Sequence, residues 1–264
     1  MKVEDFMTNL NKSLASKVAL ITGGSRGIGR AIAAKLAEDG AIVAINYAEN
    51  DVAALETLRE IQEKGGKGFL IKAVLGKDDS AENIRDALIS ELDGMGLPHS
   101  LDILINNAGM GFFANFADSS IQKFDELFAV NVRGIFHLTQ TVLPLLSDGG
   151  RIINLSSGLS KRPLNQTSVY SMSKAAVDSF TIALAKELGE RQITVNAVAP
   201  GWTLTDMNEA ALEDEGLKGF VTSGTPLGRI GKPNDIANVV GWLSSAKASW
   251  VTGQWLEASG GFGL

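Results

Sequence analysis

Short apolar runs alternate with longer amphipathic segments along most of the chain, from residue 17 onward. The short runs are apolar at nearly every position, as in strands that are buried on both faces. The longer segments repeat apolar residues every three or four positions, as at Ile28, Ile32 and Leu36, which predicts helices. The predicted strands cover 17–22, 41–47, 68–75, 101–107, 151–157, 193–200 and 252–258. The predicted helices cover 28–40, 51–65, 80–94, 120–146, 168–190 and 235–245.

Strands separated by helix-length segments predict βαβ crossovers. We therefore expect an α/β fold with a single doubly wound, Rossmann-type parallel sheet of about seven strands and helices on both faces. No stretch rich in Pro, Ser or charge divides the chain, which predicts an N-terminal extension at 1–16 and a single domain at 17–264. A long irregular stretch at about 202–234 is typical of a substrate lid in a compact domain.

Composition and charge exclude several classes of protein. The 264 residues include no Cys, which excludes disulfides and thiolate zinc sites, and His99 and His137 lack the spacing of a histidine zinc site. We therefore expect no metal. A net charge of −6 argues against nucleic-acid binding. No apolar run approaches the ~18 residues of a membrane span, and the first residues lack the apolar stretch of a signal peptide. These features favour a cytoplasmic protein that binds neither nucleic acid nor membrane.

A glycine turn with the spacing GxxxGxG at Gly23, Gly27 and Gly29 joins the first strand to the first helix. Such a turn lets the backbone approach a diphosphate at the N-terminus of the helix, so we expect a dinucleotide site. The same turn also has the G-x-S-x-G pattern of a hydrolase nucleophile elbow at 23–27, but no histidine follows His137, so a triad in the usual order is not favoured. Phosphate-loop spacing is present too, but Arg30 replaces the required Lys.

Further motifs follow this turn in a fixed order. Asn106-Asn107-Ala108-Gly109 closes the fourth strand, and Ser157 precedes the pattern Tyr170-x-x-x-Lys174. Together with Thr22 and the glycine turn, these motifs resemble the short-chain dehydrogenase/reductase family, in particular the branch that includes the 3-oxoacyl-acyl carrier protein reductases. The segments 200–205 and 226–229 add to the resemblance, which extends from about residue 17 to residue 261. It implies an oxidoreductase that uses NAD(P).

The predicted catalytic residues are Asn131, Ser157, Tyr170 and Lys174. Tyr170 and Lys174 lie four apart and share one face of a helix, where an ammonium favours the phenolate and lets Tyr170 exchange a proton with a ketone or an alcohol. By resemblance, Ser157 binds the substrate oxygen, and the family's spacing to Tyr170 favours it over Ser156. By resemblance too, Asn131 holds a water that connects Lys174 to solvent.

The predicted second strand ends at Tyr47, where the NAD-binding version of this site has an acid. Glu49 and Asp51 follow, but past the end of the strand. Arg26 can pair with a 2′-phosphate, so we expect NADP(H). The residues expected to hold the cofactor are Gly23, Ser25, Arg26, Gly27, Ile28, Gly29, Asn46, Tyr47, Val74, Leu75, Asn107, Ala108, Gly109, Tyr170, Lys174, Pro200, Gly201, Thr203 and Thr205. Val74 and Ser259 stand where the family usually has Asp.

The function favoured by these residues is an NADPH-dependent carbonyl reductase or alcohol dehydrogenase for a small molecule. One alternative is a 3-oxoacyl-acyl carrier protein reductase, for which Lys161, Arg162 and Arg191 would have to attract an acidic carrier. Another is a dinucleotide-binding protein without catalysis. Met110, Phe112, Phe113 and Phe116 could line an apolar substrate pocket or pack in the core.

Resemblance to the family also implies a homo-oligomer, most simply a tetramer. The helices at 120–146 and 168–190 would pair across one interface, and the segment 235–258 across another. The segment 120–146 is apolar on more than one stripe, and Trp242, Trp250 and Trp255 crowd the C-terminal region, as is common at interfaces.

Overall fold

The computed structural model describes residues 12–206 and 208–264. Within them the strands form one sheet in the order β3-β2-β1-β4-β5-β6-β7, and every neighbouring pair is parallel. The strands are β1 (Val18–Ile21), β2 (Ile42–Tyr47), β3 (Lys67–Lys72), β4 (Leu101–Asn106), β5 (Leu146–Leu155), β6 (Thr194–Pro200) and β7 (Trp255–Ala258). The predicted doubly wound parallel sheet is confirmed.

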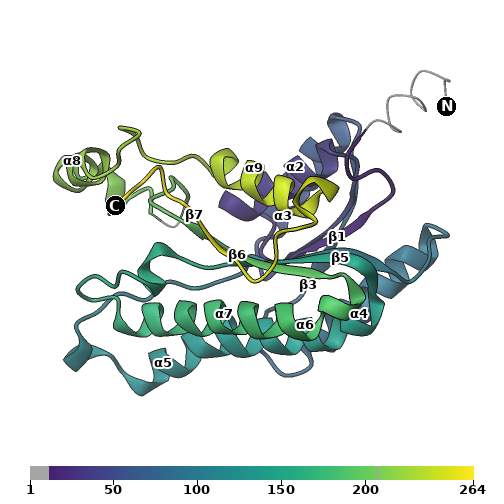
Figure 1. The fold of residues 1–264 in the computed structure, drawn as a ribbon, viewed down its shortest axis with the longest axis horizontal. Coiled ribbons are helices and arrows are strands. Elements are labelled where there is room, and N and C mark those ends of the chain that lie inside the picture. Colours follow the sequence, from purple (N-terminus) through teal and green to yellow (C-terminus); the bar gives the residue numbers. More distant parts are fainter. Residues whose placement is uncertain (1–11, 207) are drawn as a thin grey trace.

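Helices cover both faces of this sheet (Figure 1). On one face lie α2, α3 and α9, and on the other lie α4, α5, α6 and α7. Their bounds are α2 (Gly27–Glu38), α3 (Asp51–Glu63), α4 (Ser80–Gly94), α5 (Ile121–Phe128), α6 (Ile135–Val142), α7 (Ser168–Glu187) and α9 (Pro233–Ser244). A further helix, α8 (Glu215–Ser223), lies at one end of the molecule, near the C-terminus.

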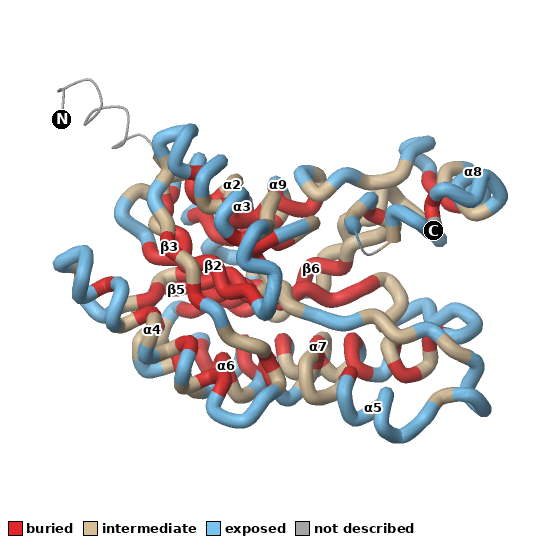
Figure 2. Tube along the Cα trace, turned by 180° about the vertical axis from the view of Figure 1, so that it is seen from behind, coloured by how far each residue is buried: buried red, intermediate tan, exposed pale blue. Residues whose placement is uncertain are grey.

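Two apolar layers hold the helices on the sheet, one on each face, and Figure 2 shows the buried residues concentrated there. Ile32 and Leu36 of α2 and Val240 of α9 are fully buried in the first layer. Leu88 of α4 and Leu138 of α6 are fully buried in the second. Since both faces are covered, the strands must be apolar at successive positions, which is the pattern that the sequence shows.

The predicted N-terminal extension falls mostly on residues 1–11, which lie outside the described residues. Of its described part, Leu14 is buried in the apolar layer that contains α2. The Leu14 amide donates to the carbonyl of Asp39 at the end of α2. The residues just before β1 therefore belong to the packed domain.

The predicted single helix at 120–146 is wrong in two respects. Its middle is a π-helical segment, η2 (Ala129–Gly134), between α5 and α6, and its last residues form a short 3₁₀ turn, η3 (Leu143–Leu145), before β5 begins. Pro144 ends the α-helix because it has no amide hydrogen and restricts the residue before it. Since β5 runs from Leu146 to Leu155, Ser157 lies two residues beyond the strand rather than on it.

The stretch at 202–234 is not irregular throughout, as it contains α8. The Asp214 side chain caps this helix by accepting from the Leu217 amide at 2.7 Å. An N-terminal cap of this type is a readable sequence signal that the acidic character of the segment obscures. Strands β3 and β7 are also shorter than predicted, so Val74 and Leu75 lie in the loop after β3.

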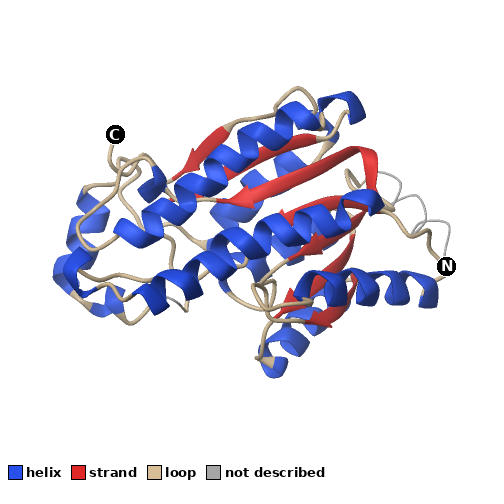
Figure 3. Cartoon of the chain, turned by 90° about the horizontal axis from the view of Figure 1, so that it is seen from below, coloured by secondary structure: helices blue, strands red, loops and turns tan. Residues whose placement is uncertain are grey.

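All seven strands point toward the same edge of the sheet, the end of the molecule where the C-terminus and α8 lie (Figure 3). The strand order reverses between β1 and β4, whose carboxyl ends are adjacent at this edge. In open α/β sheets the crevice outside such a reversal is where ligands bind. The loops after β1, β4, β5 and β6 therefore decide what the protein can bind.

Candidate active site

A cleft of about 700 Å³ opens at the carboxyl edge of the sheet. Every residue predicted to hold a cofactor lines it, as do Ser157, Tyr170 and Lys174. Asn131 does not line this cleft, although it lies beside it. The predicted cofactor and catalytic residues leave out further lining residues from the ends of the strands, the segment η2 and the lid: Ala48, Glu49, Asn50, Ala73, Met110, Val130, Leu155, Ser156, Asp206 and Asn208.

The glycine turn and the end of β4 are joined by hydrogen bonds. The Thr22 hydroxyl accepts from the amides of Asn107 and Ala108, each at 3.0 Å, and the Asn107 side chain donates to the carbonyls of Thr22 and Gly23. A Cβ at Gly29 would lie 2.1 Å from the Gly23 carbonyl oxygen, so this position accepts only glycine. The turn thereby brings the N-terminus of α2 to the floor of the cleft, where its unpaired amides favour an anion.

Lys174 is almost fully buried beneath the cleft, at 4% exposed. Its Nζ donates to the Leu155 carbonyl at 2.8 Å and lies 5.8 Å from the centre of the Tyr170 ring. Burial lowers the pKa of this ammonium to about 8, and the negative charge of Asp178 opposes that effect. The predicted sharing of one helix face by Tyr170 and Lys174 is confirmed.

Tyr170 is half-buried at the wall of the cleft, with the Phe113 ring 5.6 Å from its own. Burial raises the pKa of Tyr170, while a hydrogen bond with Ser157 lowers it. The net direction is upward, so desolvation outweighs the effect of Ser157. The predicted lowering of the phenol pKa is therefore not seen in the protein without a bound cofactor.

The two serines at the end of β5 have different partners. The Ser156 hydroxyl donates to Asp178 on α7. Ser157 instead faces Tyr170, and its hydroxyl also accepts from the Leu159 amide at 3.2 Å. The structure thus brings Ser157, rather than Ser156, to the tyrosine hydroxyl, as the spacing to Tyr170 predicts.

Asn131 is fully buried in the π-helical segment η2. Its Oδ1 accepts from the Met110 amide at 2.8 Å, and its Nδ2 donates to the Met110 carbonyl at 2.9 Å and to Ser173 at 3.2 Å. A Cβ at Gly109 would be 3.3 Å from this Oδ1 and 3.4 Å from the Lys174 Nζ, so Asn131 and Lys174 flank the same glycine. Both side-chain donors are occupied, so a water here could only donate to Oδ1 or bond the main chain. Single π-turns of this kind are frequent at functional sites.

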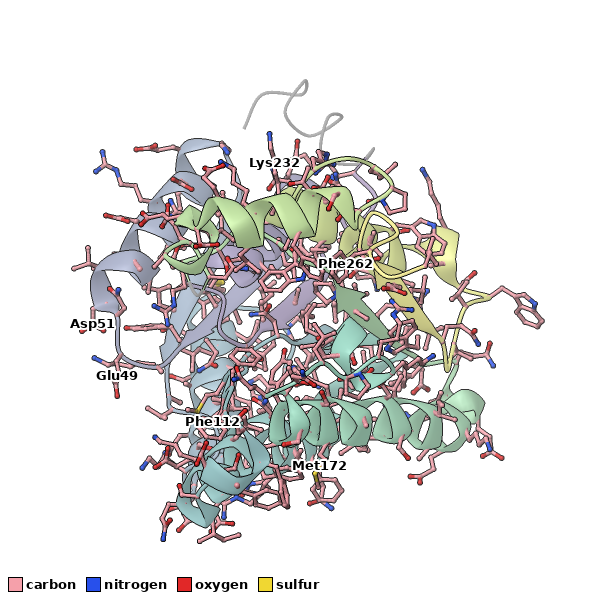
Figure 4. All side chains as sticks on the ribbon, turned by 90° about the vertical axis from the view of Figure 1, so that its left-hand side faces the viewer. Glu49, Asp51, Phe112, Met172, Lys232 and Phe262 are labelled. Atoms are coloured by element: carbon pink, nitrogen blue, oxygen red, sulfur yellow. The ribbon has the colours of Figure 1, made fainter. Side chains whose placement is uncertain are left out.

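At the other end of the cleft, Glu49 and Asp51 lie together on one flank of the molecule (Figure 4). The Tyr47 hydroxyl donates to Asp51 at 2.9 Å, and the Lys72 ammonium contacts the same carboxylate at 2.9 Å. Lys72 and Tyr47 together lower the pKa of Asp51. The Asn46 side-chain amide donates hydrogen bonds to the carbonyls of Ile71 and Ala73. It therefore holds the end of β2 against the end of β3, and its amide hydrogens are not free for a ligand.

The lid begins against the glycine turn and ends at the C-terminal segment. A Cβ at Gly27 would lie 3.4 Å from Thr205, and Asn208 ties Thr203 to Thr205 through hydrogen bonds to both. Further along, the rings of Phe220 on α8 and Phe262 lie edge to face with centres 6.0 Å apart. Ser259 packs tightly on Gly201 and accepts from the Gly261 amide, so its hydroxyl shapes the C-terminal turn.

No helix among the described residues is long and apolar enough to cross a membrane. No group of three or more His, Asp or Glu side chains in residues 12–206 and 208–264 is arranged to hold a metal ion.

Comparison with known proteins identifies the family. The sequence profile described as enoyl-(acyl carrier protein) reductase matches residues 23–263. The chain is 38% identical to the versicolorin reductase of Emericella nidulans, over 95% of this chain and 97% of the relative. It is 39% identical to a 3-oxoacyl-[acyl-carrier-protein] reductase of Staphylococcus epidermidis, over 93% of this chain and 98% of the relative. The crystal structure of the angucycline C-6 ketoreductase LanV with bound NADP superimposes with a TM-score of 0.90 at 39% identity, covering 95% of this chain and 96% of LanV.

The chain therefore belongs to the short-chain dehydrogenase/reductase family. Both the predicted family and the predicted oxidoreductase class are confirmed by these relatives.

Proposed function

We propose that this protein is an NADPH-dependent ketoreductase that interconverts a ketone and a secondary alcohol on a bulky, apolar small molecule. The observation that carries the proposal is the meeting of Ser157, Tyr170 and Lys174 in the cleft that the glycine turn opens. A protein that only bound a dinucleotide would not need a serine hydroxyl set against a half-buried tyrosine. The relatives with printed activities support the reductase class.

The cleft fits a dinucleotide on structural grounds. Its volume of about 700 Å³, the close approach of backbone at Gly23 and Gly29, and the open N-terminus of α2 suit a diphosphate. Arg26 is exposed at the rim and is the residue we propose to pair with a 2′-phosphate. LanV, which was solved with NADP, supports the same choice.

The proposed chemistry follows from the side chains in the cleft. When bound, the nicotinamide cofactor supplies the hydride. Tyr170 donates its hydroxyl proton to the carbonyl oxygen of the ketone, and the Ser157 hydroxyl donates a hydrogen bond to the same oxygen. Lys174 stabilises the phenolate that remains, because its ammonium is buried a short distance from the ring. Asn131 fixes the Met110 loop against Ser173 and holds Gly109 beside Lys174.

A bulky aromatic ketone suits the mouth of this site. Met110 lines the cleft, and Phe113 is 56% exposed while its ring packs on Tyr170. An exposed ring beside the proposed proton donor offers a stacking surface for a flat substrate. The relatives include a versicolorin reductase and LanV, an angucycline C-6 ketoreductase, which supports a free small-molecule ketone as the substrate.

The acyl carrier alternative rests on the Staphylococcus relative. The three cations expected to attract a carrier are engaged elsewhere: Arg162 pairs with Glu257, Arg191 pairs with Asp148, and the Lys161 ammonium lies 3.9 Å over the Trp255 ring. Each of the three is already paired or stacked within the chain, so we favour a free small-molecule substrate. A cytoplasmic location stays a prediction from the sequence.

We also propose a homotetramer. An apolar groove of about 670 Å³ runs between α5, α6 and the outer face of α7, where Phe128, Val132, Phe136 and Phe180 line it. Phe136 is 51% exposed there, and Trp250, before the edge strand β7, is 97% exposed. Large apolar side chains exposed at two separate sites support two interfaces of closed symmetry.

The experiment that tests the function measures loss of NADPH absorbance with two substrates. One is 1-tetralone, a fused-ring aromatic ketone, and the other is acetoacetyl-coenzyme A, which imitates a carrier-bound chain. We expect turnover of the first with a higher kcat/KM than the second, and turnover with NADPH above that with NADH. Preference for the thioester would support the carrier alternative, and failure with every ketone together with tight NADPH binding would support a protein without catalysis.

A further inference from the structure

Three successive residues, the last of β5 and the two that follow it, each contact one residue of α7. The Leu155 carbonyl accepts from the Lys174 ammonium at 2.8 Å. The Ser156 hydroxyl donates to the Asp178 carboxylate, and Ser157 lies against Tyr170, whose pKa it lowers. Since these α7 residues are spaced by four, they lie along one face of the helix. The end of β5 is therefore tied to α7 at three consecutive turns.

Asp178 is the member of this set to which the proposed mechanism gives no role. It is half-buried, one helical turn beyond Lys174. The groups that face it are the hydroxyls of Ser156 and Ser160 and the ammonium groups of Lys161 and Lys174. Of these cations, Lys161 also lies against the Trp255 ring and Lys174 is buried. The surroundings of Asp178 thus include the Ser156 hydroxyl just after β5 and the buried ammonium of Lys174.

Lys174 has no other negatively charged neighbour among the described residues that shifts its pKa. Its remaining surroundings are neutral: Tyr170 on α7, the Leu155 carbonyl of β5, Asn131 of η2 and the backbone of Gly109. Burial lowers the pKa of Lys174 to about 8, and Asp178 acts in the opposite direction. Without that carboxylate, desolvation would act on the ammonium without opposition.

We propose that Asp178 is a positioning residue for the chemistry at Tyr170. Its charge keeps Lys174 in the ammonium form at neutral pH, and its hydrogen bond with Ser156 sets the end of β5 so that Ser157 meets Tyr170. The effect of Asp178 on catalysis rests on the proposed function. Its effect on the protonation of Lys174 does not, because that can be measured in the protein without cofactor or substrate.

A purely local role is the competing explanation. In that case Asp178 would serve the turn after β5, where it meets Ser160 and Lys161, and would leave Lys174 unaffected. The two explanations differ in whether the pKa of Lys174 falls when the Asp178 carboxylate is replaced by a neutral group. Asp178→Asn keeps an oxygen that can accept from Ser156 and removes only the charge, which makes it the informative variant. Lys161→Met removes the other cation that faces Asp178 and is the matched control.

The experiment follows the protonation of Lys174 in the cofactor-free protein by NMR, with lysine labelled at the ¹³Cε position. Lys174→Arg identifies the resonance by its disappearance. We expect Asp178→Asn to lower the titration midpoint of Lys174 by about one pH unit, the size typical for loss of a nearby opposite charge. We expect Lys161→Met to leave the midpoint within the error of the wild type, and Asp178→Glu to restore it.

The pH profile of kcat/KM for ketone reduction provides the second readout. In Asp178→Asn we expect its alkaline limb to move to lower pH by the same amount as the NMR midpoint. A Lys174 midpoint that stays at the wild-type value in Asp178→Asn would overturn the proposal, and so would a larger shift in Lys161→Met than in Asp178→Asn.

If Asp178→Asn does not fold, Ser156→Ala replaces it. That variant frees the carboxylate, and we expect a lower kcat with an unchanged Lys174 midpoint; wild-type kcat would contradict the positioning of Ser157. A shifted midpoint in a protein that reduces no ketone would support this inference and refute the proposed function.

Discussion

The Tyr47 hydroxyl donates a 2.9 Å hydrogen bond to the Asp51 carboxylate, and Lys72 contacts the same carboxylate from the neighbouring strand β3. Asp51 is therefore engaged by a phenol and an ammonium and does not line the cleft, whereas Glu49 does. Because the charge of Asp51 is neutralised in this way, less negative charge opposes a phosphorylated ribose at this end of the cleft. We expect Arg26, which is exposed at the rim of the cleft, to supply the attraction for the phosphate.

We expect Arg26→Ala to weaken NADPH binding by about tenfold or more while NADH binding changes little, because a charge-assisted pair to phosphate is lost. Combining it with Tyr47→Asp should reverse the preference, since a new carboxylate would repel the phosphate. Quenching of tryptophan fluorescence by each cofactor measures both affinities. An equal loss for the two cofactors in Arg26→Ala would show that this residue does not contact the phosphate.

Tyr170→Phe should remove turnover and leave NADPH binding nearly intact. Loss of a positioned general acid costs about 10²–10⁴-fold in rate, and the ring that packs against Phe113 is retained. Steady-state kinetics and the same fluorescence titration separate the two effects. A variant with wild-type kcat would refute the assignment of Tyr170 as proton donor.

Lys174 should make the free protein less stable at neutral pH than at alkaline pH. Its pKa is about 8 in the folded protein and 10.5 in the reference state. Below about pH 8 folding carries the full cost of burying the ammonium. Between the two values the unfolded chain binds more protons, so stability rises with pH, and above 10.5 the cost is gone.

We therefore expect Lys174→Met to raise the free energy of unfolding at pH 7 by up to about 3 kcal/mol, reduced by the lost bond to the Leu155 carbonyl. The gain should vanish above about pH 10.5. Urea unfolding of both proteins without cofactor at several pH values checks this. A gain that is the same at neutral and alkaline pH would mean that relief of packing strain, not charge burial, explains it.

Gly29→Ala should destabilise the protein by roughly 1–3 kcal/mol and abolish NADPH binding, because the new methyl group would overlap the Gly23 carbonyl. Gly94→Ala, at the end of α4 with open space around its position, is the matched control and should be neutral or slightly stabilising. Thermal unfolding and the fluorescence titration report the two effects. Retained cofactor affinity in Gly29→Ala would contradict the assignment of this turn to the diphosphate.

In solution we expect a mass of four chains of 27.9 kDa each. Phe136→Asp places a charge in the apolar groove beside Phe180 and should reduce the particle to a dimer. Light scattering during size exclusion at micromolar protein measures both masses. A wild-type mass near that of one chain would overturn the proposed assembly. A mass of two chains would support only one of the two proposed interfaces.

The sequence alone determined the architecture, because the alternation of buried strands and amphipathic helices leaves few other folds. It also determined the chemical groups of the site. The glycine turn and the Tyr170–Lys174 spacing are local patterns. Local backbone geometry is enough to predict that the turn lets a diphosphate approach a helix N-terminus and that the two side chains share one helix face. The predicted cofactor residues all line one cleft for this reason, although they come from loops spread along most of the chain.

Only the tertiary structure decided which groups touch across elements. It set Ser157 rather than Ser156 against Tyr170, and joined Asp51 to Tyr47 and Lys72 although Asp51 lies past the strand end. It also showed that the buried middle of the predicted long helix is π-helical around Asn131. These features depend on the register between β5 and α7, on the pairing of β2 with β3, and on packing around one buried amide. Register and packing are long-range properties, and a periodic pattern in the sequence carries no information about them.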